Sequence, residues 1–306
     1  MKNKITVITP TFNRAHTLER AFESLKAQTL KEFKWIIMDD GSTDETKKLI
    51  ERLKTESSFE IEYFYHSNRH KFHTVFDGIK MVKTPYFTIL DSDDTYPPDA
   101  LQILFDEAEK IENQEDFIAV MGLSIDKDGK IVGDRYPGDG FDGSILEMRY
   151  KYKIKGDKNG IFISNTYQKI LNKFEYSSIP ERINAPHKIF FNFYDSKGFK
   201  TKFINKGIRI YHQDASDKQS LTNLRSKGEN RWGLMLGYLS FLNSYGSQLY
   251  SYPTALVRNL AAYQIYAIAN KKGFSEIIKD LKYFKLQAIL LYPFVFVYTQ
   301  FQKRLS

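Results

Sequence analysis

Residues 86–101 read YFTILDSDDTYPPDAL, and this stretch contains a strand, an acidic turn and the start of a helix. Its first five residues, Tyr86–Leu90, are aromatic, aliphatic or β-branched, which favours a buried strand. The dipeptide Pro97-Pro98 suits the first turn of a helix, where a proline loses no hydrogen bond. Between the two elements stands the acidic segment 91–94, DSDD. The stretch therefore predicts a buried strand that carries three carboxylates to one edge of a sheet.

The chain before this stretch repeats the same alternation of strand and helix. Short β-rich runs predict strands at 5–9, 35–38 and 61–65, and apolar residues at helical spacing predict helices at 16–25, 42–53 and 74–82. Ser42 and Glu45 fit a capping box at the start of the second helix. Together with a helix from residue 97, this pattern predicts an α/β fold, with a Rossmann-like, mostly parallel sheet flanked by helices.

Polar residues follow three of the predicted strands. Pro10, Thr11 and Asn13 come after the first strand, Asp39-Asp40 after the second, and the DSDD segment after the fourth. Ligands of such sheets bind at the carboxyl ends of the strands. These residues therefore form the predicted binding site.

Three carboxylates as close together as those of the DSDD segment repel one another unless a positive charge neutralises them. A hard divalent cation, Mn²⁺ or Mg²⁺, does so with oxygen ligands and leaves positions open for phosphate oxygens. Such a metal stabilises a departing diphosphate. The alternative is a structural role, because acidic residues before Pro97 favour the N-terminal end of a helix dipole. The second acidic pair, Asp39-Asp40, favours the metal site.

Several catalytic classes are disfavoured by motifs that the sequence lacks. It has no G-x-G-x-x-G after the first strand, no G-x-x-x-x-G-K-[ST], no H-E-x-x-H and no G-x-S-x-G. It also has no cysteine, which excludes disulfides, thiolate zinc sites, iron–sulfur clusters and a cysteine nucleophile. Dehydrogenases, P-loop NTPases, zincins and serine hydrolases are therefore disfavoured.

Three segments together resemble the N-terminal half of a family 2 glycosyltransferase with the GT-A fold: VITPTFNR at 7–14, MDDGSTDET at 38–46 and ILDSDDTYPPDAL at 89–101. The resemblance implies inverting transfer of a hexose or N-acetylhexosamine from a nucleotide-diphospho-sugar, usually a UDP-sugar. It implies that the acceptor is a hydroxyl of a glycan or a lipid-linked molecule. It also implies a catalytic domain at 1–220, with a donor half at about 1–125 and an acceptor half at about 126–220. Beyond the resemblance, helical spacing and an excess of basic residues predict a basic helical region at 221–306.

The resemblance also implies roles for single residues. These are Pro10, Thr11 and Asn13 in the nucleotide pocket, Asp40 at the base, Asp91 at the ribose and sugar, Asp93 on the metal, and Asp94 as a lesser candidate for either of the last two roles. The family often has a glycine before the fourth strand, whereas residues 68–73 read NRHKFH here. Lys71 or Arg69 is expected to reach the diphosphate. The alternative is a solvated basic loop.

An inverting enzyme needs one general base that takes the proton from the attacking hydroxyl. The resemblance implies an acidic residue well after the DSDD segment, and the candidates there are Glu181 and His187, with Asp195 third. The alternative for each is a loop residue without a catalytic role. His212, after the last strand of the resemblance, is expected to be a further metal ligand, and the alternative is a histidine that hydrogen-bonds to backbone.

The net charge of +8 lies in the C-terminal part of the chain. Residues 1–215 hold 33 Lys and Arg against 33 Asp and Glu, whereas residues 216–306 hold 12 against 4. Apolar residues and lysines share helical spacing at 274–285, and the apolar run AILLYPFVFVY at 288–298 is too short to cross a bilayer. Basic amphipathic helices with aromatic residues lie in membrane interfaces. With no signal peptide in the sequence, we expect a cytoplasmic protein in peripheral contact with an anionic membrane; the alternative is packing on the catalytic domain.

Two other functions fit parts of the sequence. A nucleotidyltransferase also uses paired carboxylates and a metal on an α/β sheet, although it usually has a glycine-rich basic loop where this chain has TPTFNR at 9–14. A nucleic-acid-binding protein would use the basic tail, but the tail has no recognised nucleic-acid motif and no nucleic acid is the expected partner.

Overall fold

The structure, a computed structural model, describes residues 2–181, 183–212 and 230–305. The chain divides into two compact units. The first comprises Met1–Ser178 and Gly198–Gln213, and the second comprises Ile179–Lys197 and Asp214–Ser306. The domain boundary expected at residue 220 lies outside the described residues.

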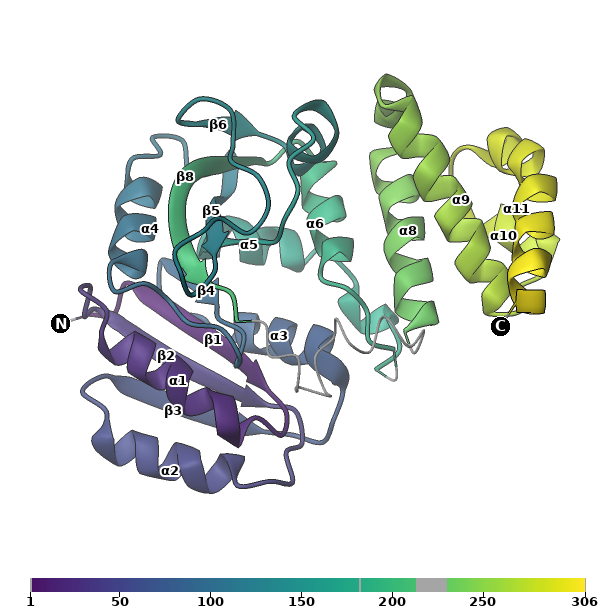
Figure 1. Ribbon diagram of the computed structural model, residues 1–306. Helices are drawn as coiled ribbons and strands as arrows, with labels where there is room; N and C mark the ends of the chain where they lie inside the picture. Colours follow the sequence, from purple (N-terminus) through teal and green to yellow (C-terminus); the bar gives the residue numbers. More distant parts are fainter. Residues whose placement is uncertain (1, 182, 213–229, 306) are drawn as a thin grey trace. The chain divides into compact units, whose positions relative to one another are not determined.

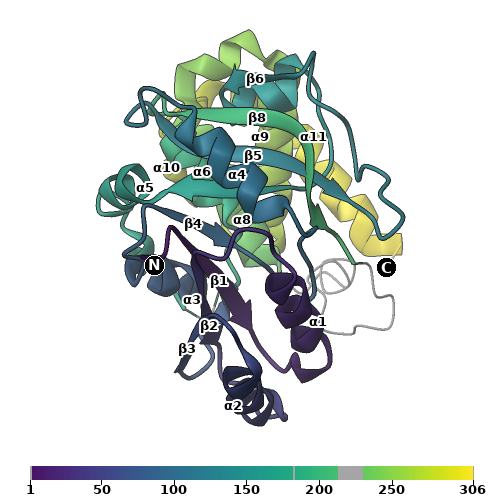
Figure 2. The same ribbon diagram turned by 90° about the vertical axis from the view of Figure 1, so that its left-hand side faces the viewer.

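The first unit is built around a mixed sheet with the strand order β3-β2-β1-β4-β7-β5-β8-β6 (Figures 1 and 2). Its strands are β1 (Ile5–Thr11), β2 (Phe33–Asp39), β3 (Glu60–Tyr65), β4 (Tyr86–Ile89), β5 (Phe117–Ile125), β6 (Gly140–Gly143), β7 (Lys158–Ile163) and β8 (Lys200–Ile210). The first four strands are parallel, β7 is antiparallel to both β4 and β5, β8 is parallel to β5, and β6 is antiparallel to β8. The predicted α/β sheet is confirmed, and the strand order reverses at β1, which lies between β2 and β4.

Helices cover both faces of the parallel strands. They are α1 (Ala15–Lys26), α2 (Thr46–Glu56), α3 (His70–Lys80), α4 (Ala100–Glu109) and α5 (Ser164–Leu171), with short helical turns at Glu147–Lys151 and Tyr176–Ser178. Val7 of β1 shares a buried cluster with Leu18 and Phe22 of α1. A Cβ on Gly78 of α3 would lie 3.0 Å from the Ile8 side chain. Because successive residues of a strand face opposite sides, α1 and α3 cover opposite faces of the sheet (Figure 2).

The predicted capping box at the start of α2 is wrong. The helix begins at Thr46, and Glu45 precedes it without a side-chain capping bond. The Asp44 carboxylate instead accepts hydrogen bonds from the N–H of Thr46, at 3.1 Å, and from its hydroxyl, at 2.5 Å. The Ser42 hydroxyl accepts one from the Asn13 N–H at 2.8 Å. Ser42 is therefore used to join two loops, which the local sequence pattern does not reveal.

The second unit is helical in the part that the structure describes. Its helices are α6 (Lys188–Asp195), α8 (Arg231–Tyr245), α9 (Pro253–Ala269), α10 (Phe274–Asp280) and α11 (Lys285–Leu305), with a helical turn at Gly246–Ser251. The expected helical character of the C-terminal region is confirmed in its described part, which includes α8 and α9. The helical spacing at 274–285 does not produce one helix over that stretch, since α10 ends at Asp280 and Phe284 adopts a positive φ of 63° before α11. None of the described helices combines the length and the apolar character that crossing a membrane requires.

Candidate active site

The carboxyl ends of three neighbouring strands lie at one edge of the sheet. Thr11 at the end of β1 is paired with Asp39 of β2, and the Asp40 N–H donates to the Thr11 carbonyl at 2.9 Å. On the other side of β1, the Leu90 N–H donates to the Ile8 carbonyl at 2.9 Å. The acidic residues after β2 and β4 therefore flank the end of β1, where the strand order reverses. Open α/β sheets bind ligands in the crevice at such positions.

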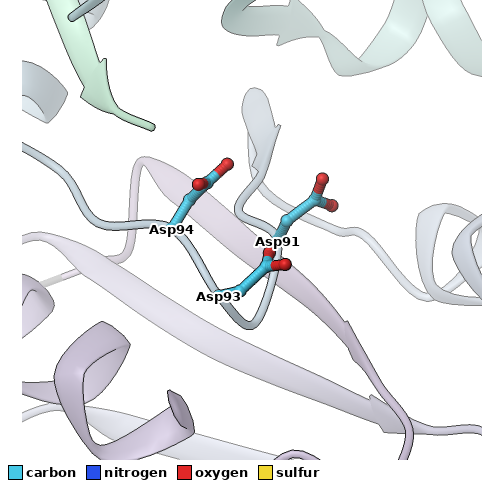
Figure 3. A group of neighbouring side chains, drawn as sticks. All are labelled: Asp91, Asp93 and Asp94. Atoms are coloured by element: carbon cyan, nitrogen blue, oxygen red, sulfur yellow. The ribbon is translucent and has the colours of Figure 1, made fainter. Parts of the chain in front are cut away.

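Asp91, Asp93 and Asp94 project from the loop after β4 and form one cluster (Figure 3). The Asp94 N–H donates to the Asp91 carbonyl at 3.0 Å, which makes a tight turn. One carboxylate oxygen from each residue lies within 4.8 Å of the other two. Carboxylate oxygens are ligands that Mn²⁺ and Mg²⁺ prefer, so the donor set fits the predicted divalent cation.

Two basic side chains neutralise two of these carboxylates. Lys71 Nζ lies 2.6 Å from Asp91. Although burial opposes the charge of Lys71, the Asp91 carboxylate offsets this and raises the pKa of the amine, which stays protonated. Arg209 of β8 lies 3.3 Å from Asp94. Lys71, which the sequence places near the diphosphate, is thus brought into the acidic cluster.

Asp93 has the weakest positive partner of the three carboxylates. Arg14, the charged side chain paired with it, lies 4.0 Å away. Burial and then the neighbouring Asp91 carboxylate raise the pKa of Asp93. The charges of Lys71 and then Arg14 offset this in part, so the ionised carboxylate of Asp93 is incompletely compensated and gains from a bound cation.

Asp94 is held by the protein itself. Its side chain is 1% exposed, and its carboxylate accepts a hydrogen bond from the His212 N–H at 3.1 Å in addition to pairing with Arg209. Burial raises the pKa of Asp94 to about 7 despite the nearby guanidinium. Asp94 therefore ties the end of β8 to the acidic loop.

His212 follows β8 directly. Its ring Nε2 lies 2.9 Å from the Thr95 hydroxyl, and burial lowers the pKa of the imidazole, which favours the neutral form. Among the described residues, the close group of potential ligand atoms consists of the three aspartates and does not include His212. Its role as a metal ligand stays a prediction.

Asp40 is fixed by the segment that follows β3. Its Oδ1 accepts a hydrogen bond from the Arg69 N–H at 2.7 Å, and burial raises the pKa of this carboxyl. Gly41, next in the chain, has a φ of 90°, and a Cβ there would lie 2.8 Å from the Asn68 nitrogen. A side chain at position 41 would push the two segments apart, so the position of Asp40 depends on this glycine.

The predicted nucleotide residues at the end of β1 have different surroundings. Pro10 and Thr11 are buried, and the Thr11 hydroxyl has no hydrogen-bond partner among the described residues. A buried hydroxyl without a partner is costly, so a ligand that reached it would gain a hydrogen bond. Asn13 adopts a φ of 52°, and its Oδ1 accepts a hydrogen bond from the Thr43 N–H at 2.7 Å. The Asn13 side chain therefore joins the loops after β1 and β2.

Three arginines at this site have no role assigned to them from the sequence. Arg14 pairs with Asp93, and Arg20 of α1 donates a hydrogen bond to the Asp93 carbonyl at 2.5 Å. Arg14 ends the segment VITPTFNR, so a basic residue just after a strand end is a usable signal for it. Arg209 stands between Ile208 and Ile210 in β8, and nothing in the surrounding sequence marks it as part of the site.

The candidates for the general base belong to the second unit. Glu181 is exposed, and His187 lies directly before α6. For both residues, the expected role as general base stays a prediction. Asp195, the third candidate, is buried in α6 and accepts a hydrogen bond from the Tyr245 hydroxyl at 2.6 Å, so it is engaged inside the second unit.

Carboxylates grouped at the ends of parallel strands in an α/β sheet suit a cation that binds a phosphate-bearing ligand. The chain belongs to glycosyl transferase family 2, whose model matches residues 6–219. A "GalNAc(5)-diNAcBac-PP-undecaprenol beta-1,3-glucosyltransferase" of Campylobacter jejuni is 27% identical over 249 residues, which are 80% of this chain and 75% of the relative. An uncharacterized glycosyltransferase of Rickettsia felis is 33% identical over 143 residues, which are 47% of this chain but only 23% of that protein.

Solved structures share the fold at low sequence identity. The crystal structure of S. aureus TarS aligns with a TM-score of 0.63 and 16% identity over 98% of this chain and 53% of TarS, so this chain spans about half of that protein. TarS 1-349 in complex with UDP-GlcNAc gives a TM-score of 0.56 at 14% identity, covering 99% of this chain and 92% of the other. The mannosyltransferase PcManGT from Pyrobaculum calidifontis, in complex with GDP-Man and Mn²⁺, gives 0.57 at 14% identity, covering 99% and 85%.

The family and the fold confirm two predictions from the sequence. The first unit has the GT-A fold, and the chain is a member of the glycosyltransferase family.

Proposed function

We propose that this chain transfers a hexose or N-acetylhexosamine from a UDP-sugar to a hydroxyl of a lipid-linked glycan, with inversion at C1. The Campylobacter relative is named for glucosyl transfer to an undecaprenol-linked acceptor, and TarS binds UDP-GlcNAc. The observation that carries the proposal is the acidic loop after β4, which follows the strand next to β1. In this loop the negative charge of the Asp93 carboxylate is only partly compensated by positive side chains. That position suits a diphosphate leaving group and its cation.

The donor lies across the carboxyl ends of β1, β2 and β4 in this proposal. The nucleotide pocket is formed by Pro10, Thr11, Asn13 and Asp40. Asp91 faces the ribose and the sugar, and Lys71, 2.6 Å from Asp91, directs its positive charge at the diphosphate.

Asp93 would hold the divalent cation, Mn²⁺ or Mg²⁺, with Asp91 and Asp94 beside it and His212 as a further ligand. When bound, the cation stabilises the negative charge of the leaving diphosphate. PcManGT binds Mn²⁺ together with GDP-Man, which supports this choice of metal. Lys71 and Arg14 add positive charge from the chain itself.

The transfer is a single displacement. The general base takes the proton from the acceptor hydroxyl as the hydroxyl oxygen forms a bond to C1 of the sugar. The bond from C1 to the diphosphate oxygen breaks, and its electron pair leaves with the diphosphate. Attack from the face opposite the leaving group inverts C1, and no covalent intermediate with the enzyme forms.

Separate variants distinguish the two candidates for the base. Glu181→Gln or His187→Ala is expected to lower kcat by about a hundredfold or more when the residue is the base, because the proton then has no acceptor. UDP binding, measured by calorimetry, should be retained. Glu175→Gln, an exposed glutamate nearby in the sequence, serves as the matched control. Normal turnover in both test variants would show that the base lies elsewhere.

A panel of nucleotide-sugars tests the proposed function. With Mn²⁺ present, we expect release of UDP from at least one UDP-sugar, and loss of that release when the metal is chelated. UDP with Mn²⁺ should also raise the melting temperature, since a ligand that binds the folded state stabilises it. Stabilisation by ATP or by DNA, without release from any nucleotide-sugar, would refute the proposal.

A lipid-linked acceptor is held in a membrane. We therefore place the enzyme peripherally at the cytoplasmic face of a membrane that contains anionic lipid, in keeping with the +8 charge of the chain.

A further inference from the structure

Helix α11 exposes a continuous apolar surface, which we call the α11 strip. It consists of Leu286, Leu290, Phe294, Val297 and Phe301, whose exposed fractions are 65%, 64%, 74%, 52% and 61%. Spacings of three and four residues place these side chains on one face of the helix. From 286 to 301 the helix has no charged residue.

The opposite face of α11 packs inside the second unit. Ala288, Val295 and Thr299 are buried, and the Gln264 amide of α9 donates a hydrogen bond to the Ala288 carbonyl at 2.7 Å. The helix is therefore anchored through one face, whereas each side chain of the α11 strip stays more than half exposed. An exposed apolar surface of this extent marks an interaction site.

Positive charge lies at both ends of the strip. Lys279, Lys282 and Lys285 are exposed at its N-terminal end, and Lys303-Arg304 follow it in the sequence. The ion pairs between described residues include Lys272 with Asp280 in this region, but none that involves the three exposed lysines. These lysines are thus available to an anionic partner.

We propose that the α11 strip inserts into the interface of an anionic lipid bilayer, with the helix axis parallel to the membrane plane. The apolar side chains enter the boundary of the acyl chains, and the lysines contact the headgroups. Exposed Tyr283 and Tyr298 suit the same interface, where tyrosine is enriched. The inference rests on the proposed function, because membrane binding would serve to bring the active site to a lipid-linked acceptor.

The charges favour lipid over a second copy of the chain. Since both ends of α11 are positive, pairing two strips in either direction would bring like charges together. Anionic headgroups would neutralise the same charges.

Cosedimentation with lipid vesicles tests the proposal without any donor or acceptor. The full chain should bind vesicles that contain about 30% phosphatidylglycerol, and bind phosphatidylcholine alone much more weakly. Phe294→Glu is expected to lower the partition coefficient by about tenfold or more, because a charge enters the apolar boundary. Val257→Glu, which changes an exposed apolar residue of α9, is the matched control and should bind like the wild type. Replacing Lys279, Lys282 and Lys285 with glutamine should weaken binding to the anionic vesicles by about tenfold or more.

Two results would overturn the inference. One is the lack of any vesicle binding that depends on the strip, seen either as equal binding by the wild type and Phe294→Glu or as no binding by the wild type. The other is a concentration-dependent dimer that Phe294→Glu dissociates, without vesicle binding, which would assign the strip to a second copy. Circular dichroism checks that the variants are folded, and Leu290→Glu replaces Phe294→Glu in case the latter unfolds. The vesicle assay needs no catalysis, so its result can be interpreted even if the proposed transferase activity is absent.

Discussion

Replacing Asp93 with asparagine is expected to lower kcat by about a hundredfold to a thousandfold. The amide keeps the size of the side chain but loses the negative charge that attracts a divalent cation. Asp93 lies 4.0 Å from Arg14 and is also stabilised by the charge of Lys71, yet its pKa remains raised, so its ionised form depends on the cation. Transfer and metal binding should therefore fail together, measured as UDP release and as Mn²⁺ affinity by calorimetry.

Asp106→Asn is the matched control for this prediction. Asp106 is an exposed aspartate of α4, and the same change there should alter neither metal affinity nor turnover. The melting temperature of the Asp93 variant should stay at or above that of the wild type, because removing a carboxylate relieves repulsion with Asp91. A variant that turned over normally with Mn²⁺ would refute the role assigned to Asp93.

Replacing Arg209 with methionine is expected to lower the free energy of unfolding of the first unit by about 3–5 kcal/mol. The Arg209 side chain is 3% exposed, and it pairs with Asp94 at 3.3 Å and with Asp157 at 2.8 Å. It also donates to the Ser124 hydroxyl at 2.9 Å. Without the guanidinium, the pKa of the buried Asp94 carboxyl rises further, so the group must take up a proton or remain as an uncompensated buried charge, and either outcome destabilises the folded state.

Tryptophan fluorescence during urea unfolding can report the unfolding of the first unit alone. The chain has two tryptophans, buried Trp35 in the first unit and exposed Trp232 in the second. In a Trp232→Phe background, fluorescence therefore follows Trp35. Arg52→Met removes an arginine from exposed ion pairs on α2 and should change unfolding little.

A double variant isolates the buried pair. Arg209→Met combined with Asp94→Asn should lose less stability than Arg209→Met alone, because no unpaired carboxylate remains. Equal losses in the single and double variants would mean that Arg209 stabilises the unit through packing and through its other partners.

Much of the fold could be predicted because its signals are local. The strands and helices of the first 110 residues follow from apolar runs and helical spacing, which depend on neighbours in the chain. The place of Asp91, Asp93 and Asp94 follows from the end of one strand at Ile89. The break before α11 was not predictable in the same way, because apolar spacing continues through 281–284 while the backbone turns at Phe284.

The roles of single polar residues depended on contacts across the fold. Asn13 looks like a nucleotide ligand in the sequence, yet its side chain accepts a hydrogen bond from Thr43 in another loop. Asp94 looks equivalent to its two neighbours, yet it is bound by Arg209 from β8. Neither partner is close in the chain, so no local pattern could indicate these contacts.

The order of residues was enough to establish the alternating strands and helices, the family resemblance and the acidic edge of the sheet, since each arises from short segments. The folded chain alone determined how the three carboxylates differ. Lys71 and Arg209 form close ion pairs with two of them from other elements, while Asp93 lies 4.0 Å from Arg14 and interacts with Lys71 without forming such a pair. The compensation of a charge depends on its distance from opposite charges, and those distances are set only when segments far apart in the sequence pack together.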